Sequence, residues 1–106
     1  MEMVMVGDKY LASGFRLIGI EVIEAMDDDD AAKKVEATVS EGKYKIIVMS
    51  EKVALRTKTL RDDLLRAKKA FPVFLVIPDF EGPLNERTKE LRDLVDHAIG
   101  IKLKIE

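Results

Sequence analysis

The sequence contains no cysteine and no tryptophan. Without cysteine the protein forms no disulfides, offers no thiolate to a metal ion and has no cysteine nucleophile. No apolar run reaches the roughly 20 residues that a membrane-spanning helix needs, and the first residues do not show the basic-then-apolar order of a signal peptide. These absences predict a soluble, intracellular protein without direct membrane insertion. Its 106 residues suffice for one domain with a core of its own.

An excess of charge of one sign is also missing. Eighteen basic residues stand against twenty acidic ones, so the net charge is -2 and no global field attracts nucleic acid. The two tyrosines and four phenylalanines do not alternate with a basic run, as a base-stacking surface would require. We therefore expect no nucleic-acid partner. Charged residues of both signs make up 36% of the chain, which fits either a thermophilic origin or a surface rich in ion pairs.

The first twenty residues predict a strand, a turn and a helix. Met3 to Val6 is apolar on both side-chain faces, which is typical of a parallel strand covered on both sides. Gly7 permits a sharp turn, and Asp8 is a suitable cap for the helix that follows. That helix carries an apolar stripe at three- and four-residue spacings and ends at Gly19.

The carboxyl end of such a strand is where ligands usually bind in open α/β sheets. The glycines here are too far apart for a dinucleotide fingerprint, and no P-loop motif occurs. Asp8, Ser50 and Glu51 would line one end of the sheet if their strands are neighbours, which raises an acid/base or phosphate-binding hypothesis. Helix capping by Asp8 and Ser50 is the favoured interpretation, because nothing nearby supplies a nucleophile with an activating base. We therefore predict no catalytic residue and no cofactor.

Strands and helices alternate along the rest of the chain. Further strands are expected at Ile20–Ile23, Tyr44–Met49 and Phe71–Pro78, with a helix that ends at Gly42 between the first two. Asp27 to Asp30 precede that helix; they lack the spacing of a calcium loop, and a helix start is favoured over a metal site. The alternation predicts an α/β fold: a single doubly wound four-stranded parallel sheet with helices on both faces.

One long helix is expected from Glu51 to Lys69. It contains seven basic and three acidic residues, a local excess of +4. Such a basic face can meet an acidic partner surface, although a solvated outer face is the default interpretation.

The last quarter of the chain adds a C-terminal helix and a short tail. Leu84, Thr88, Leu91, Val95 and Ala98 alternate in steps of four and three, so this helix either covers its own sheet or packs on a partner helix. The tail Ile99–Glu106 alternates apolar and polar residues like a half-exposed strand. His97, the sole histidine, cannot make a metal site alone. We divide the chain into a core, residues 1–80, and this C-terminal part, residues 81–106.

Several stretches together resemble the F subunit of the archaeal and vacuolar-type rotary ATP synthases. The resemblance is carried by Gly7-Asp8, by Gly14-Phe15-Arg16-Leu17-Ile18-Gly19-Ile20, by Ile46 to Glu51, by Pro72 to Pro78 and by Ala98 to Ile101. The family often has alanine where this chain has Ile18, a small departure. The resemblance implies a doubly wound domain in the central rotor stalk, bound to the coiled-coil D subunit, peripheral on the cytoplasmic side of the membrane and without an active site, cofactor or metal.

The resemblance also implies an interface on the C-terminal helix. Its residues would be Leu84, Arg87, Thr88, Glu90, Leu91, Arg92, Val95 and Ala98. The family is credited with influencing ATP hydrolysis through contacts of this helix with the catalytic head, for which Arg87, Glu90 and Arg92 are the polar candidates.

Two alternatives remain at this point. A receiver-like signalling domain shares the fold class but needs an acidic pair, an acceptor aspartate and a lysine around a magnesium ion. This chain offers Asp8 alone, Ser50 in place of the acceptor, and no suitably placed lysine. The other alternative is a small enzyme that binds a nucleotide at the carboxyl edge of the sheet.

Overall fold

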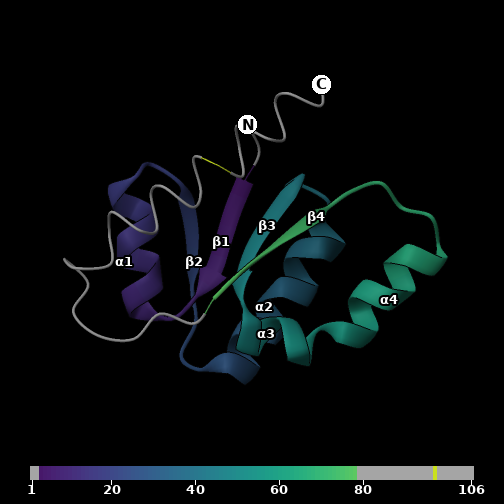
Figure 1. The fold of residues 1–106 in the computed structure, drawn as a ribbon, viewed down its shortest axis with the longest axis horizontal. Coiled ribbons are helices and arrows are strands. Elements are labelled where there is room, and N and C mark those ends of the chain that lie inside the picture. The colour runs from purple at the N-terminus through teal and green to yellow at the C-terminus, as the bar shows by residue number, and fades with distance from the viewer. Residues whose placement is uncertain (1–2, 79–96, 98–106) are drawn as a thin grey trace.

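The computed structural model describes residues 3–78 and residue 97 (Figure 1). Strands and helices alternate along the chain as expected, except between the last two strands, where two helices follow one another. Their order is β1 (Met3–Gly7), α1 (Lys9–Leu17), β2 (Glu21–Glu24), α2 (Asp28–Glu41), β3 (Ile46–Ser50), α3 (Glu51–Arg56), α4 (Lys58–Arg66) and β4 (Val73–Ile77).

All four strands are parallel, in the order β2-β1-β3-β4. Every residue of the two inner strands, β1 and β3, is buried. This burial explains why both strands are apolar on both faces, since helices cover a parallel sheet on each side. The predicted four-stranded doubly wound α/β fold is confirmed.

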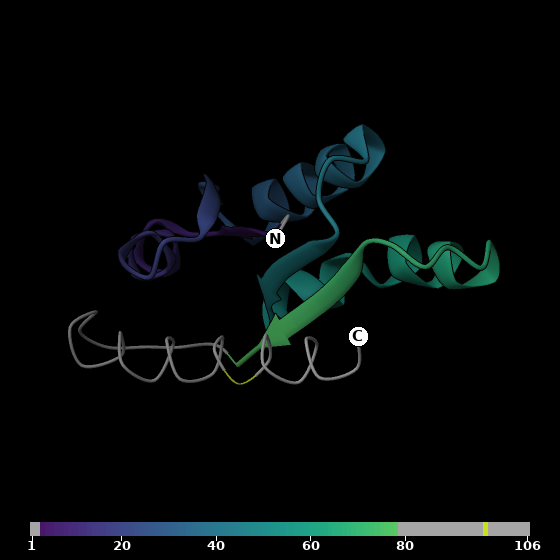
Figure 2. The same cartoon turned by 90° about the horizontal axis from the view of Figure 1, so that it is seen from above.

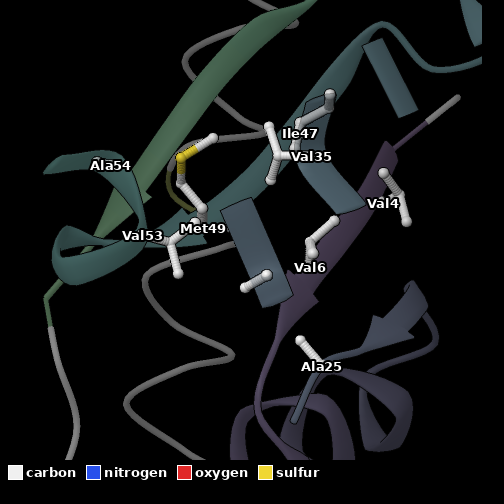
Figure 3. Close-up of a cluster of buried hydrophobic side chains, with 9 residues drawn as sticks. Val4, Val6, Ala25, Val35, Ile47, Met49, Val53 and Ala54 are labelled. Carbon is white, nitrogen blue, oxygen red and sulfur yellow. The ribbon is translucent and has the colours of Figure 1, made fainter. Parts of the chain in front are cut away.

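Each face of the sheet carries its own hydrophobic cluster. On one face, Leu11 and Phe15 of α1 join Met5 and Val48 of the inner strands. On the opposite face, α2 and α3 cover the sheet, as Figures 1 and 2 show together. Figure 3 shows the second cluster, which includes Val4, Val6, Ala25, Val35, Ile47, Met49, Val53 and Ala54. Each large apolar side chain buried in this way contributes about 1.5–3 kcal/mol.

The ends of α1 and α2 are where the sequence placed them. The amide of Ile20 bonds the carbonyl of Phe15 at 3.1 Å and that of Gly19 bonds Arg16 at 3.0 Å, with Gly19 at a φ of 84°, which is a Schellman ending. Gly42 caps α2 at a φ of 68°. The side chain of Asp27 accepts from the amide of Asp30, so the interpretation of the four aspartates as a helix start is confirmed.

The single helix expected from Glu51 to Lys69 is wrong, because Thr57 divides it into α3 and α4. Thr57 has a φ of -107° and a ψ of 13°, outside the helical region, and is buried. Its hydroxyl donates to the carbonyls of Val53 at 3.1 Å and Ala54 at 3.2 Å, bonds that bend helices. After this bend α4 runs away from the sheet (Figure 2).

The edge strand β4 also differs from expectation. Its run is apolar on both faces like that of β1, yet only Ile77 is fully buried and Val76 is 40% exposed. The flanking Pro72 and Pro78 lie just outside the strand, where they do not interrupt its hydrogen bonds. The predicted C-terminal helix, the tail and the division at residue 81 lie outside the described residues, apart from an exposed His97.

Candidate functional site

The carboxyl edge of the sheet brings the polar residues singled out in the sequence together. Strands β1 and β3 are neighbours, with Met5 paired to Val48. Asp8 and Glu51 each stand three residues beyond that pair, so they follow their strands at the same level of the same edge. The structure therefore places the loops of Asp8, Ser50 and Glu51 next to one another, as the sequence predicted for neighbouring strands.

Asp8 is occupied as a helix cap. One carboxylate oxygen, Oδ1, accepts from the amide of Tyr10 at 2.8 Å and from that of Leu11 at 2.9 Å. These are two of the amides at the helix start that have no partner within the helix. The capping interpretation of Asp8 is confirmed.

Ser50 has the same role at α3. Its hydroxyl accepts from the amide of Val53 at 3.4 Å, and the residue is only 5% exposed. Glu51 is exposed in the first turn of α3, where the helix dipole favours a negative charge. Asp8 and Ser50 thus complete two helix ends, and Glu51 lies in the first turn of the second helix.

A shallow hollow of about 400 Å³ lies beside this edge, next to β1 and β2. Its lining combines charged side chains with Tyr10 and Met26, which are 71% and 90% exposed. Across the parts of the chain that the structure describes, no three acidic or histidine side chains are arranged to hold a metal ion.

The acidic run at the start of α2 connects helices. Asp29 accepts from Arg56 Nε of α3 at 2.7 Å, and Asp28 lies 3.8 Å from the same guanidinium. Asp30 accepts from the amide of Met26 at 2.9 Å and pairs with Lys34 at 3.0 Å. The hydrogen bond from Met26, followed by the one from Lys34, lowers the pKa of Asp30. The carboxylates of Asp28, Asp29 and Asp30 therefore have partners within the fold.

A second surface lies between α4 and β4, where sequence reasoning expected a covered strand. It is a groove of about 300 Å³, and the residues lining it include Arg61, Leu64, Leu65, Lys69, Phe74 and Val76. Only the general signal of a basic helix pointed to it, because the bend at Thr57 that opens the groove was not foreseen. We call these six residues the α4–β4 groove.

The predicted partner interface on the C-terminal helix is not placed by the structure. Its residues Leu84, Arg87, Thr88, Glu90, Leu91, Arg92, Val95 and Ala98 lie outside the described residues. Within residues 3–78, none of the helices combines the length and apolar character needed to cross a bilayer.

The fold and this edge define a class: small doubly wound α/β domains in which the polar residues at the carboxyl edge complete helix ends. The fold matches the crystal structure of the F subunit of the V-type ATP synthase from Archaeoglobus fulgidus with a TM-score of 0.60. The match covers 72% of this chain and 95% of that chain at 23% identity, so it bears on the fold alone.

Sequence comparison identifies the family. A family model described as ATP synthase (F/14-kDa) subunit matches residues 3–95. The F subunit of the A-type ATP synthase of Methanocaldococcus jannaschii is 32% identical over 105 residues, which cover 98% of this chain and 100% of that one. The F subunit of the V-type ATP synthase of Clostridium perfringens is 29% identical over 100 residues, covering 93% and 92%. The chain belongs to the ATP synthase (F/14-kDa) subunit family, the F subunits of A-type and V-type ATP synthases.

This membership confirms the resemblance found in the sequence. The F subunit is a non-catalytic component of the rotary ATP synthase, in agreement with the prediction that the chain is not an enzyme by itself. The family assignment therefore takes the place of the two alternatives, the receiver-like domain and the small nucleotide-binding enzyme.

Proposed function

We propose that the chain is a rotor subunit in the central stalk of its ATP synthase, on the cytoplasmic side of the membrane. It binds the long coiled-coil D subunit and so helps to couple ATP synthesis or hydrolysis in the head to ion translocation. The observation that carries this proposal is the family match over residues 3–95, which spans both the α/β core and most of the C-terminal stripe.

The contact with the coiled coil is assigned to the C-terminal stripe. Leu84, Thr88, Leu91, Val95 and Ala98 recur in steps of four and three, the spacing with which one helix packs along another. The neighbouring Arg87, Glu90 and Arg92 provide polar contacts, through which the same helix influences hydrolysis in the head.

Co-expression with the coiled-coil stalk subunit tests the assignment. In the double variant Leu91→Asp/Val95→Asp, two carboxylates replace the centre of the stripe. Burying even neutral polar groups without partners costs on the order of 2–7 kcal/mol. Binding should therefore weaken by about thirtyfold or more, as measured by isothermal titration calorimetry.

The matched control is Asn85→Asp/Lys89→Asp, which adds two carboxylates to the same segment but away from the stripe. It should bind like the wild type. Equal binding by the wild type and the Leu91→Asp/Val95→Asp variant would show that the docking surface lies elsewhere. Complexes assembled with alanine at Arg87, Glu90 and Arg92 test the regulatory role, because their rate of ATP hydrolysis should change while assembly is retained.

A further inference from the structure

The helix α4 is amphipathic, but its apolar side chains are only partly covered: Leu60 and Leu64 are half-buried, Leu60 against the second hydrophobic cluster. None of its residues is buried, and Leu65 is 73% exposed. The bend at Thr57 turns α4 away from the sheet, so its packing contacts are mainly with α3 (Figures 1 and 2). By contrast, α1, α2 and α3 each bury apolar side chains.

The bend is held by specific contacts, so the groove beside α4 is built into the fold. The carbonyl of Ala54 accepts from Arg61 Nη2 at 2.6 Å, which ties α4 back to α3 across Thr57. Arg61 Nε is buried and has no acceptor among the described residues. Leu64 and Leu65 of α4 and Phe74 and Val76 of β4 form the apolar lining of the groove.

The charge around the groove is positive although the whole chain is negative. Residues 58–69 contain five basic and two acidic residues, a local charge of +3, which leaves -5 for the rest of a chain whose net charge is -2. Both acidic residues form ion pairs within α4: Asp62 with Lys58 at 3.0 Å and Asp63 with Arg66 at 2.7 Å. Within residues 3–78, Arg61, Lys68 and Lys69 form no ion pair with a carboxylate.

An apolar lining with basic residues beside it fits one kind of occupant best. An amphipathic helix inserts side chains of successive turns into such a groove, and carboxylates beside its apolar stripe would meet Arg61 and Lys69. Nucleic acid fits poorly, because the chain as a whole is acidic and the groove offers a single aromatic ring, Phe74.

We propose that the α4–β4 groove is a second docking surface, which takes an amphipathic helix of a stalk subunit whose apolar stripe is flanked by acidic residues. The proposal rests on the rotor function proposed above and adds a contact through the core of the domain to the one assigned to the C-terminal stripe. The chain would then hold its partner at two separate places.

The test uses the full chain and the coiled-coil stalk subunit, with single substitutions at exposed positions. Leu65→Asp places a carboxylate in the apolar lining, and Lys69→Glu reverses a charge beside it. We expect Leu65→Asp to weaken binding by about tenfold or more, as for loss of one buried apolar side chain. Lys69→Glu should weaken it less, and its effect should shrink as salt is raised, because screening weakens exposed ion pairs.

The control for Leu65→Asp is Leu55→Asp on α3. Leu55 is 75% exposed, much like Leu65, but does not line the groove. The Leu55→Asp variant should therefore bind the stalk subunit like the wild type. Because the chain has no cysteine, Lys69→Cys also gives a unique site for a photo-crosslinker, which should attach to an acidic helical segment of the stalk subunit. Lys52→Cys on α3 is the matched control and should not crosslink there.

The outcomes separate this proposal from the rotor assignment. Wild-type binding that persists unchanged in Leu65→Asp and Lys69→Glu would overturn the groove proposal alone, whereas absence of wild-type binding would overturn both. A dimer of the free chain that Leu65→Asp dissociates would identify a second copy as the occupant. A melting temperature lowered by Leu65→Asp but not by Leu55→Asp would identify a segment of the chain itself. Either of these two results would overturn the partner helix.

Discussion

The carboxyl edge of the sheet and the α4–β4 groove differ in how their polar and apolar groups are used. At the edge, Asp8 and Ser50 accept from backbone amides of their own helices. At the groove, Arg61 Nε has no acceptor within the described residues, and Leu65 and Val76 remain exposed. In many α/β domains the carboxyl edge of the sheet binds the ligand. Here the groove, with its exposed apolar side chains, has the stronger signs of an unoccupied binding surface.

The difference comes from the short polar residues that stand at the helix boundaries. Asp8, Asp27 and Ser50 each stand one residue before a helix, so the polar groups nearest the edge are engaged as soon as those helices form. Thr57 stands between two helices without a capping side-chain bond and turns the chain outward. Short polar side chains therefore have opposite effects: at the carboxyl edge they satisfy the helix ends, whereas Thr57 exposes the groove between α4 and β4.

The largest expected effect is on the free energy of unfolding, when a buried side chain is compared with an exposed one. Phe15 on α1 is completely buried, so Phe15→Ala should lower the free energy of unfolding by about 3–5 kcal/mol through lost burial and a cavity. Leu65→Ala on α4 should change it by less than about 0.5 kcal/mol, because that side chain is already exposed. Urea denaturation of both variants measures the contrast. A cost at Leu65 comparable to that at Phe15 would show that α4 belongs to the core of the free chain.

The core and the helix ends could be predicted because their signals are local. The apolar run from Met3 to Val6 and the one around Ile47 specify buried strands, and single residues such as Asp8 and Gly42 specify helix ends. Each of these features depends on the residue and its near neighbours in sequence. The acidic run at Asp27 to Asp30 was interpreted correctly for the same reason.

The groove could not be predicted, because it depends on the break between α3 and α4 at Thr57, and the apolar spacing of the sequence does not show this break. Val53, Leu60 and Leu64 continue at helical spacing straight through Thr57. What ends α3 is the burial of Thr57 near Met49, where its hydroxyl lies 3.5 Å from the sulfur, and this contact exists only once β3 and α3 have packed. The partial exposure of β4 follows from the same break, since α4 no longer lies over it.

An intermediate effect is expected at Asp8 and tests whether the carboxyl edge is only structural. Asp8→Ala removes the acceptor for two amides of α1 and should lower the free energy of unfolding by about 1 kcal/mol. Asp8→Asn keeps an acceptor oxygen and should stay within a few tenths of a kcal/mol of the wild type, because asparagine caps helices about as well. Chemical denaturation gives both values.

A binding measurement with Asp8→Asn distinguishes a purely structural role of Asp8 from a contact with the partner. If Asp8 serves only as a cap, Asp8→Asn should bind the coiled-coil stalk subunit as the wild type does. A loss of binding without a loss of stability would assign the carboxyl edge a direct contact with the partner, and the contrast between the two surfaces would then be wrong.

The smallest effect concerns the pH dependence contributed by Asp30. Hydrogen bonds from the amide of Met26 and from Lys34 lower its pKa from 3.8. A carboxyl whose pKa is lower in the folded state stabilises the fold above its unfolded pKa, and this contribution is lost as the pH falls through the folded value. The stability difference between the wild type and Asp30→Asn should therefore be constant near neutral pH and shrink below about pH 3.8.

Lys34→Gln separates the two causes when the free energy of unfolding in urea is measured over the same pH range for the wild type and both variants. It removes the ammonium group but leaves the Met26 amide, which is the larger of the two causes. Most of the pH dependence should therefore remain in Lys34→Gln and disappear in Asp30→Asn. If Lys34→Gln abolished the pH dependence as completely as Asp30→Asn, the hydrogen bond from the Met26 amide would not be what holds Asp30 ionised. The ionised state of Asp30 would then depend on its exposed ion pair with Lys34, whereas Asp8 and Ser50 accept from backbone amides.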